Sequence, residues 1–249
     1  MKQLSITKLR QIEMVVARGY EIDEDESELL EINDPENNFD NMYNLFKSLY
    51  MDNNNKDFLF IPQNQKSTNT RIKLSNFYSR EKKNKNDNEY LLVYYASDNS
   101  SNQSKDLSAV AVKEALNNIK KYIRNITETD SSITDDNIDI IIISPVKING
   151  EKINNVLGQL KNIQVFYDGN LTNNPTEHKH YNVHIKLSDE EKYKVLKEAG
   201  VKLNQTTIIR EGDAISRWFG YKPGDLIKVI RDSTIVNISS TSLQYRHCV

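Results

Sequence analysis

Residues 211–231 read EGDAISRWFGYKPGDLIKVIR, and each step of this stretch specifies local structure. Asp213 is a short hydrogen-bond acceptor of the kind that caps the first turn of a helix. The apolar residues that follow have the spacing of one helix face, and they are Ala214, Ile215, Trp218 and Phe219. Ser216 and Arg217 fall on the opposite side, so we expect a short helix with one packed face and one polar face.

The chain is predicted to reverse direction directly after this helix. Gly220 can adopt the positive φ that ends a helix, and Pro223-Gly224 supplies the fixed and the free φ of a type II turn. The next residues are rich in β-branched types and are bounded by Asp225 and Arg231. They predict a mostly buried strand, whose apolar residues are Leu226, Ile227, Val229 and Ile230.

This helix–turn–strand unit resembles the signature of the fifth-subunit family of eukaryotic multi-subunit RNA polymerases, which has a counterpart in archaeal RNA polymerase. The family reads Gly-Asp-Pro-Val-Ala-Arg-Tyr-Phe-Gly, then a basic residue, Gly, and an apolar strand ending in Arg. Trp218 stands where the family has another aromatic residue, Tyr. The residues at matching positions are Gly212, Asp213, Arg217, Phe219, Gly220, Lys222, Gly224 and Arg231.

The resemblance implies that this part of the chain is an assembly domain that grips the largest polymerase subunit. Tyr245-Arg246 matches the family's terminal Tyr-Arg, whereas Thr207 and Ala214 replace two family prolines. The family's Pro-Ser-Glu-Thr-Ala-Gly motif is reduced to Ser233-Thr234. We expect the partner-binding residues to be Asp213, Arg217, Trp218, Tyr221, Lys222, Arg231, Tyr245 and Arg246.

Length and composition fit a chain of one large or two small domains, since 37% of its 249 residues are hydrophobic. Two domains are favoured. A net charge of −2 and a pI near 6.1 argue against a free-standing nucleic-acid binder. The only cysteine, Cys248, excludes an intramolecular disulfide and fits a reducing compartment. The start, MKQLSITKLR, lacks the apolar core of a secretory signal, and no apolar run approaches the ~20 residues of a membrane helix.

The first part of the chain has two helical patterns separated by an acidic run. Residues 5–18 repeat apolar side chains at helical spacing, and residues 36–50 do so after an Asp34-Pro35 cap. We interpret the acidic run Glu21–Glu31 as a solvated surface. DNA mimicry is the alternative, and nothing further in the sequence supports it.

Strand-like and helix-like segments then alternate, as in an α/β domain. The strands are predicted at Asp57–Pro62, Tyr90–Tyr95 and Ile138–Ile143, and the helices at Leu107–Tyr122 and Ile153–Leu160. Ile138–Ile143 has almost no polar face, so we expect a parallel or mixed sheet covered on both sides. The resemblance implies a nuclease-like jaw domain that lacks the active site. Solvated loops are predicted at Arg80–Glu89, Ser97–Lys105 and Thr127–Asp136.

The polar segment Asn170–Pro175 is the predicted domain boundary. It divides the chain into an N-terminal jaw domain, residues 1–169, and a small α+β C-terminal assembly domain, residues 170–249. Within the latter, Ser188 and Glu191 form a capping box, and Gly200 ends the helix. Its buried stripe is predicted to be Val195, Leu196 and Ala199.

Three histidines invite a metal-site interpretation, which strand geometry disfavours. The apolar residues from Tyr181 to Leu187 alternate with His180 and His184, so the segment predicts one strand with all three imidazoles, His178 included, on its other face. At ~3.3 Å per residue, His180 and His184 lie roughly 13 Å apart, too far to share one zinc ion. The family has a His, a Pro and a second His here, and Asn182 replaces the Pro.

Known catalytic patterns are not found. Gly150 lacks the surrounding residues of a phosphate loop. His247 and Cys248 are neighbours in a predicted strand and point to opposite faces, so they form no nucleophile pair. Asp136, Asp139 and Lys147 flank the central strand, but their spacing fits no metal-nuclease motif.

The sequence therefore predicts a non-catalytic structural subunit of a multi-subunit DNA-directed RNA polymerase, with no cofactor, metal or membrane of its own. Its expected partners are the largest subunit, other polymerase subunits and downstream DNA. Lys147 and Lys152 are the DNA-proximal candidates. The alternatives are a metal-dependent nuclease and a free nucleic-acid-binding module built on the N-terminal domain. Abundant Asn, Lys and Ile indicate an AT-rich genome, which points to a protist or a large DNA virus. We expect an intracellular protein, located in a nucleus or, if viral, in a cytoplasmic viral factory and virion.

Overall fold

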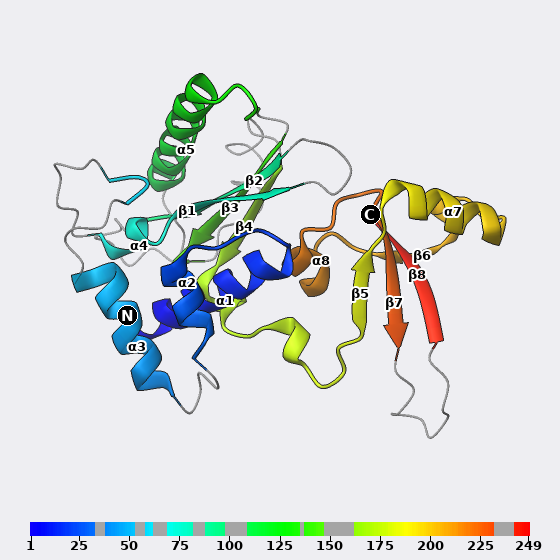
Figure 1. Ribbon diagram of the computed structural model, residues 1–249, viewed down its shortest axis with the longest axis horizontal. Helices are drawn as coiled ribbons and strands as arrows, with labels where there is room; N and C mark the ends of the chain where they lie inside the picture. Colours follow the sequence, from blue (N-terminus) through cyan, green and yellow to red (C-terminus); the bar gives the residue numbers. More distant parts are fainter. Residues whose placement is uncertain are drawn as a thin grey trace. The chain divides into compact units, whose positions relative to one another are not determined.

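The computed structural model describes residues 1–32, 38–52, 58–61, 69–81, 88–97, 109–134, 137–146, 162–231 and 242–249. The chain forms two compact units, Met1–Asn173 and Asn174–Val249. Both are drawn in Figure 1. The boundary predicted from sequence, between residues 169 and 170, falls in the helical turn η2 (Asp168–Leu171) of the first unit.

The first unit is built on a four-stranded mixed sheet of order β1-β2-β3-β4. Its strands are β1 (Asn76–Glu81), β2 (Asn88–Tyr95), β3 (Ile138–Ser144) and β4 (Ile163–Tyr167). β1 pairs with β2 antiparallel, whereas β2, β3 and β4 are mutually parallel. The predicted mixed α/β sheet is therefore confirmed.

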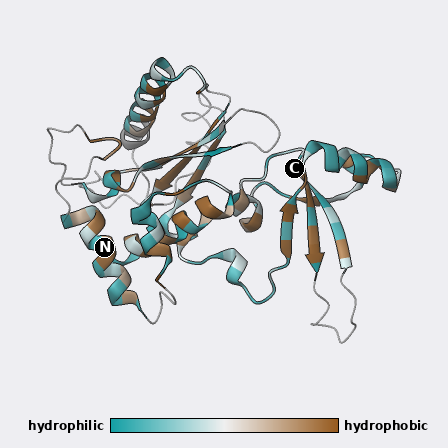
Figure 2. Ribbon diagram, in the orientation of Figure 1, coloured by the Kyte–Doolittle hydropathy of each residue, from teal (hydrophilic) through white to brown (hydrophobic). Residues whose placement is uncertain are grey.

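Helices cover both faces of this sheet. Figure 1 shows α5 (Ala109–Thr129) on one side and α1 (Lys2–Ala17) on the other. β3 is buried along its length except for half-buried Asp139, because it has strands on both edges and helices above and below. The apolar colour of the strands in Figure 2 follows the same pattern. The α5 side of the core contains Leu92, Tyr94, Ala115, Leu116, Ile119, Ile123, Ile140 and Ile142.

Among the described residues 38–73, the first unit has three short helical elements. They are α3 (Phe39–Lys47), the π-helical turn η1 (Ser48–Asp52) that continues it, and α4 (Thr70–Lys73). The helix predicted at 36–50 corresponds to α3 and η1, although its predicted start lies outside the described residues. The helix predicted at Ile153–Leu160 also lies outside them.

Several sequence-based boundaries in this unit were wrong. Phe58–Ile61 is a turn rather than a strand, because Phe60 packs its ring against Tyr94 and Tyr122 on the side of the sheet. α5 continues through Thr129, into a predicted loop. The predicted loop Arg80–Glu89 begins and ends in paired strands, where the side chains of those two residues form an ion pair. β1 and β4 were not predicted.

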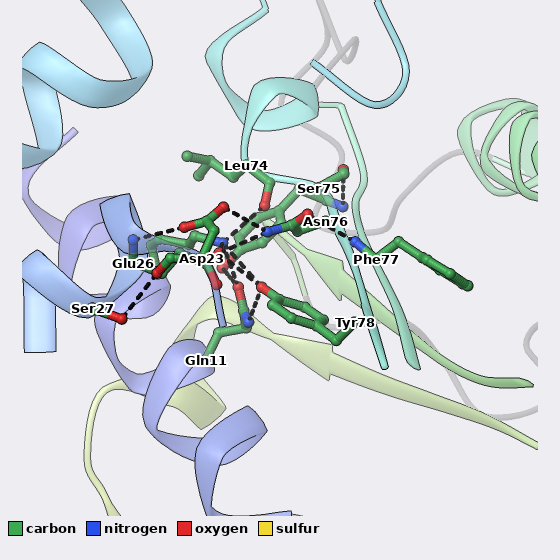
Figure 3. A network of polar contacts seen from close by, with 11 residues as sticks. Gln11, Asp23, Glu26, Ser27, Leu74, Ser75, Asn76, Phe77 and Tyr78 are labelled. Carbon is green, nitrogen blue, oxygen red and sulfur yellow. Dashed lines mark hydrogen bonds and ion pairs between the residues drawn. The ribbon is translucent and has the colours of Figure 1, made fainter. Parts of the chain in front are cut away.

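The acidic run also differs from its prediction, since it contains helix α2 (Glu24–Leu30). Asp23 caps α2 by accepting a hydrogen bond from the backbone N–H of Glu26. The Glu26 side chain is buried, and its Oε1 lies 2.6 Å from Nζ of buried Lys8 on α1. Figure 3 shows the surrounding network, in which Gln11, Asn76 and Tyr78 take part. A solvated surface was therefore the wrong interpretation for Glu26, which pairs with a charge eighteen residues away.

The second unit has its own four-stranded sheet, of order β5-β7-β8-β6. Its strands are β5 (Val183–Lys186), β6 (Thr207–Ile209), β7 (Leu226–Arg231) and β8 (Ser242–Cys248). β7 is antiparallel to both β5 and β8, and β6 is parallel to β8.

Two α-helices and two short 3-10 helices surround this second sheet. They are α7 (Asp189–Ala199), α8 (Ala214–Phe219), η3 (Pro175–Glu177) and η4 (Leu203–Gln205). Sheet and helices together agree with the predicted small α+β architecture. Among the described residues of the whole chain, no helix has both the length and the apolar content needed to cross a membrane.

Candidate partner-binding site

The signature stretch forms the helix, turn and strand predicted for it. Asp213 Oδ1 accepts a hydrogen bond of 2.9 Å from the backbone N–H of Ile215, which caps α8. Gly220 ends the helix with φ of 69°, and Gly224 has φ of 94° as a type II turn requires. The turn closes with a 3.0 Å hydrogen bond from Asp225 N–H to the Lys222 carbonyl. These predictions are confirmed.

Strand register divides the side chains of the second sheet between two faces, because directly paired residues share a face and alternate residues return to it. One face is packed. Its core consists of Ile209, Ile227, Val229 and Cys248, with Tyr221 and parts of Ile215 and Phe219 from the signature stretch covering it. α8 and the turn after it thus cover this face of the sheet.

The other face, here called the open sheet face, presents apolar side chains to solvent. Val183 pairs with Ile230, which pairs with Leu243, and these three therefore share this face. Ile185 follows Val183 by two residues, and Ile208 pairs with His247 on the same side. The exposed fractions are 49% for Val183, 43% for Ile185, 55% for Ile208 and 55% for Leu243. An apolar face left this open is typical of a surface that binds another protein.

Helix α7 adds to the exposed apolar area of the unit. Its N-terminus has the predicted capping box of Ser188 and Glu191, and Gly200 ends it with φ of 65°. The predicted buried stripe is wrong, however, because no residue of α7 is buried. Val195 and Leu196 are only half-buried, and Ala199 is exposed. The apolar residues do recur at helical spacing, but the rest of the chain covers them only in part.

The expected partner-binding residues do not form one surface. Trp218 and Tyr221 are buried, and burial raises the pKa of the Tyr221 hydroxyl well above its usual value. Tyr245 shares the open sheet face, since it pairs with Lys228, whereas Arg246 points to the packed side. Asp213, Lys222 and Arg231 are exposed.

The polar face predicted for α8 is wrong at two positions. Ser216 is fully buried, and Arg217 is half-buried, so that desolvation lowers its pKa. η3 is a neighbour of α8, so this short helix is not open to solvent on every side away from the sheet. Ala214, predicted to pack, is exposed.

Three of the expected partner-binding residues, Asp213, Arg231 and Arg246, carry charges that act on His184. Burial lowers the pKa of His184, and the positive charges of Arg246 and Arg231 lower it further, while Asp213 acts in the opposite direction. The ring Nδ1 donates a 2.5 Å hydrogen bond to the Asn182 carbonyl.

The histidine strand was predicted too long. β5 begins at Val183, while His178 and His180 lie in the turn before it with ring centroids 5.6 Å apart. No group of three or more His, Cys, Asp or Glu side chains within the described ranges is arranged to hold a metal ion. His247 Nδ1 lies 2.9 Å from Thr206 Oγ1, and burial raises the pKa of the Cys248 thiol to about 11. A thiol with that pKa is protonated at neutral pH and is a poor nucleophile.

The carboxyl edge of the first sheet, where α/β enzymes usually bind ligands, is occupied by an ion pair. Arg71 donates to both carboxylate oxygens of Asp168, at 2.7 and 2.9 Å, and its Nε donates to the Ala96 carbonyl at 2.8 Å. Asp139 is the second residue of β3, at the opposite edge. Gly150, Asp136, Lys147 and Lys152 lie outside the described residues.

Sequence reasoning missed the open sheet face. The alternation of Val183, Ile185 and Leu187 was used to predict a strand with the imidazoles on its other face, and whether the apolar face is covered was not considered. Only Leu187 is buried. An alternating pattern shows that a strand has one apolar face, but it does not show whether the same chain or a partner covers that face.

Comparison with known proteins gives matches to one family. The family model of the RNA polymerase Rpb5 C-terminal domain matches residues 173–248. The DNA-directed RNA polymerase subunit Rpo5 of Sulfurisphaera tokodaii is 41% identical over 75 residues, which are 30% of this chain and 86% of the relative. Rpo5 of Sulfolobus acidocaldarius is 41% identical over 66 residues, 26% of this chain and 75% of the relative. Rpo5 of Saccharolobus shibatae is 45% identical over 58 residues, 22% of this chain and 69% of the relative.

Proposed function

Because the chain belongs to the Rpb5 family of DNA-directed RNA polymerase subunits, whose archaeal relatives are named Rpo5, we propose that its second unit binds the largest subunit of that enzyme. The chain is a structural subunit of the polymerase and acts in transcription. Neither the metal-dependent nuclease nor the free nucleic-acid-binding module is favoured as its function.

One observation carries the assignment of binding to the second unit. The residues matched by the family model, 173–248, are nearly those of the compact unit Asn174–Val249. That unit also has the open sheet face and the uncovered stripe of α7. Apolar area of this kind costs free energy in water, at about 25 cal/mol per Å², and a partner that covers it gains that amount. We place the contact with the largest subunit there.

We propose that the first unit is the jaw near downstream DNA and that it has no catalytic role. The Arg71–Asp168 pair supports the second point, since it fills the edge of the sheet where a nuclease or transferase would place its ligand. Lys147 and Lys152 remain the proposed phosphate contacts, which would be salt-sensitive and would not depend on base sequence. The proposed location is a nucleus, or a viral factory and virion.

Affinity purification of the tagged full chain from cells that contain its polymerase tests the proposed contact. Ile185→Asp with Leu243→Asp places two charges on the open sheet face at positions that are 43% and 55% exposed, so the fold tolerates them. Recovery of the largest subunit should fall at least about tenfold, since burying two unpaired carboxylates costs several kcal/mol.

Val16→Asp is the matched control, because Val16 is an exposed apolar residue of the first unit with 44% exposure. It should leave recovery unchanged. Normal recovery with the double variant would exclude the open sheet face as the contact, and loss with the control would show that the assay reports misfolding.

A further inference from the structure

A pocket beside α5 in the first unit has no role in the assembly proposed above. It has a volume of about 280 Å³ and lies between the turn Leu59–Ile61 and one side of α5. Small-molecule sites usually have roughly 300–1,000 Å³, so this one has room for a single ring-sized group. The α5 residues that line it are Asn118, Lys121, Tyr122 and Asn125.

The lining combines three kinds of group. The rings of Phe60 and Tyr122 have centroids 5.2 Å apart and form the apolar wall. Asn118 donates 3.1 Å to the hydroxyl of Tyr94, which fixes the direction of its carboxamide, and Asn125 supplies a second, exposed carboxamide. Lys121 adds one ammonium group at the mouth. None of the described lining residues is acidic.

The segment of α5 that lines the pocket is basic, although Glu114 and Glu128 flank it and the chain as a whole is not basic. Residues 117–125 read NNIKKYIRN, with three cationic side chains and no carboxylate, in a chain of net charge −2. Flat rings, carboxamides that both donate and accept, and nearby cations are the groups with which proteins hold a base and its phosphate. An aromatic peptide side chain would match the rings but has no negative group for Lys121.

We propose that this pocket binds one nucleotide unit, with the base against Phe60 and Tyr122, its edge on Asn118 and Asn125, and the phosphate on Lys121. The base enters as a free nucleotide or as part of a single strand, and both have the same chemistry. In a polymerase both sources are close at hand. Because the pocket lies in the first unit, a negative result for nucleotide binding would leave the proposed polymerase contact of the second unit unaffected.

The test is fluorescence anisotropy of the full chain with labelled ten-nucleotide single-stranded DNA at low salt, with AMP as competitor. Asn125→Ala removes a hydrogen bond to the base edge and Lys121→Ala removes a charge-assisted hydrogen bond to the phosphate, so each should weaken binding at least about threefold. Both side chains are exposed, and neither substitution should change the melting temperature. Competition by AMP would identify the free nucleotide as the source, and its absence would identify the single strand.

Arg124→Ala is the matched control, because it removes a charge from the exposed side of the same helix outside the pocket lining. It should weaken binding less than about twofold, and this small loss should disappear at higher salt, because salt screens the attraction between an exposed charge and DNA. Equal losses for Arg124→Ala and Lys121→Ala would show binding to charge alone and would overturn the proposal. It would also be overturned by an absence of binding, or by an acidic peptide that displaces the DNA with the same dependence on Asn125.

Discussion

Removal of the buried Lys8 charge should destabilise the first unit far more than removal of an exposed lysine charge. Lys8 Nζ lies 2.6 Å from Glu26 Oε1, 2.9 Å from Gln11 Oε1 and 3.1 Å from the Leu74 carbonyl oxygen. Both charged side chains are almost fully buried. In Lys8→Met the Glu26 carboxylate remains buried without its counter-charge, although the Tyr78 hydroxyl still donates to it at 2.8 Å.

The expected cost follows from this geometry. Breaking a buried pair by removing one partner costs about 3–5 kcal/mol, which for a unit of this size lowers the melting temperature by about 6–20 °C. Glu26 Oε2 has no hydrogen-bond partner within the described residues, and Oε1 keeps only the neutral donors Tyr78 and Asn76, so the carboxylate is left without a counter-charge. Adding Glu26→Gln removes the orphaned charge but keeps an acceptor for Tyr78, and it should restore about half of the loss or more.

Urea unfolding followed by circular dichroism measures the effect, and tryptophan emission reports the unfolding of the second unit by itself. The one tryptophan, Trp218, lies in the second unit, so its transition should not move. Lys47→Met is the control. Lys47 lies 3.7 Å from Asp52 with both side chains about half exposed, and such pairs contribute about 0–1 kcal/mol. If Lys8→Met costs less than about 1 kcal/mol, or if Glu26→Gln does not rescue it, the pair does not hold α2 as described.

Three further outcomes are expected. Burial lowers the pKa of His184, so the unfolded chain binds the proton more tightly, and the second unit should lose stability as pH falls below about 6.5. Thermal unfolding followed by Trp218 emission at pH 7 and pH 5.5 should show this loss, and His184→Gln should reduce it. The same dependence of stability on pH in His184→Gln as in the unchanged chain would contradict the prediction. Arg71→Ala should cost about 3–5 kcal/mol by leaving Asp168 with no counter-charge, whereas a loss under 1 kcal/mol in urea unfolding would mean that solvent reaches the pair. In the assembled polymerase, a photocrosslinker at Lys147 should label downstream DNA in a salt-sensitive manner, and labelling by the isolated chain at physiological salt would argue against a role confined to the complex.

Local chemistry was predictable wherever consecutive residues agreed with one another. Asp213, Gly220 and Pro223-Gly224 each act within four residues of their own position, and the structure has the cap, the helix end and the turn expected of them. The strand Ile138–Ser144 was equally clear, because a run without a polar face has to be covered on both sides.

What the sequence could not provide depends on contacts between distant segments. The pairing of Lys8 with Glu26 joins two helices, and an acidic run gives no sign of which carboxylate will be buried. Phe60 illustrates the same limit, since its segment has the apolar content of a strand but packs as a turn against Tyr94. For the candidate site, the pattern identified the apolar alternation at Val183 and Ile185 but not the absence of a cover over it.

Competition between the two units tests most directly that the second unit carries the binding to polymerase. Residues 1–173 and 174–249 are expressed separately and offered in equal amounts to a polymerase that lacks this subunit, and retention on the largest subunit is measured. We expect residues 174–249 to be retained and to displace the full chain, and residues 1–173 not to be retained. Retention of residues 1–173 together with loss of residues 174–249 would contradict it.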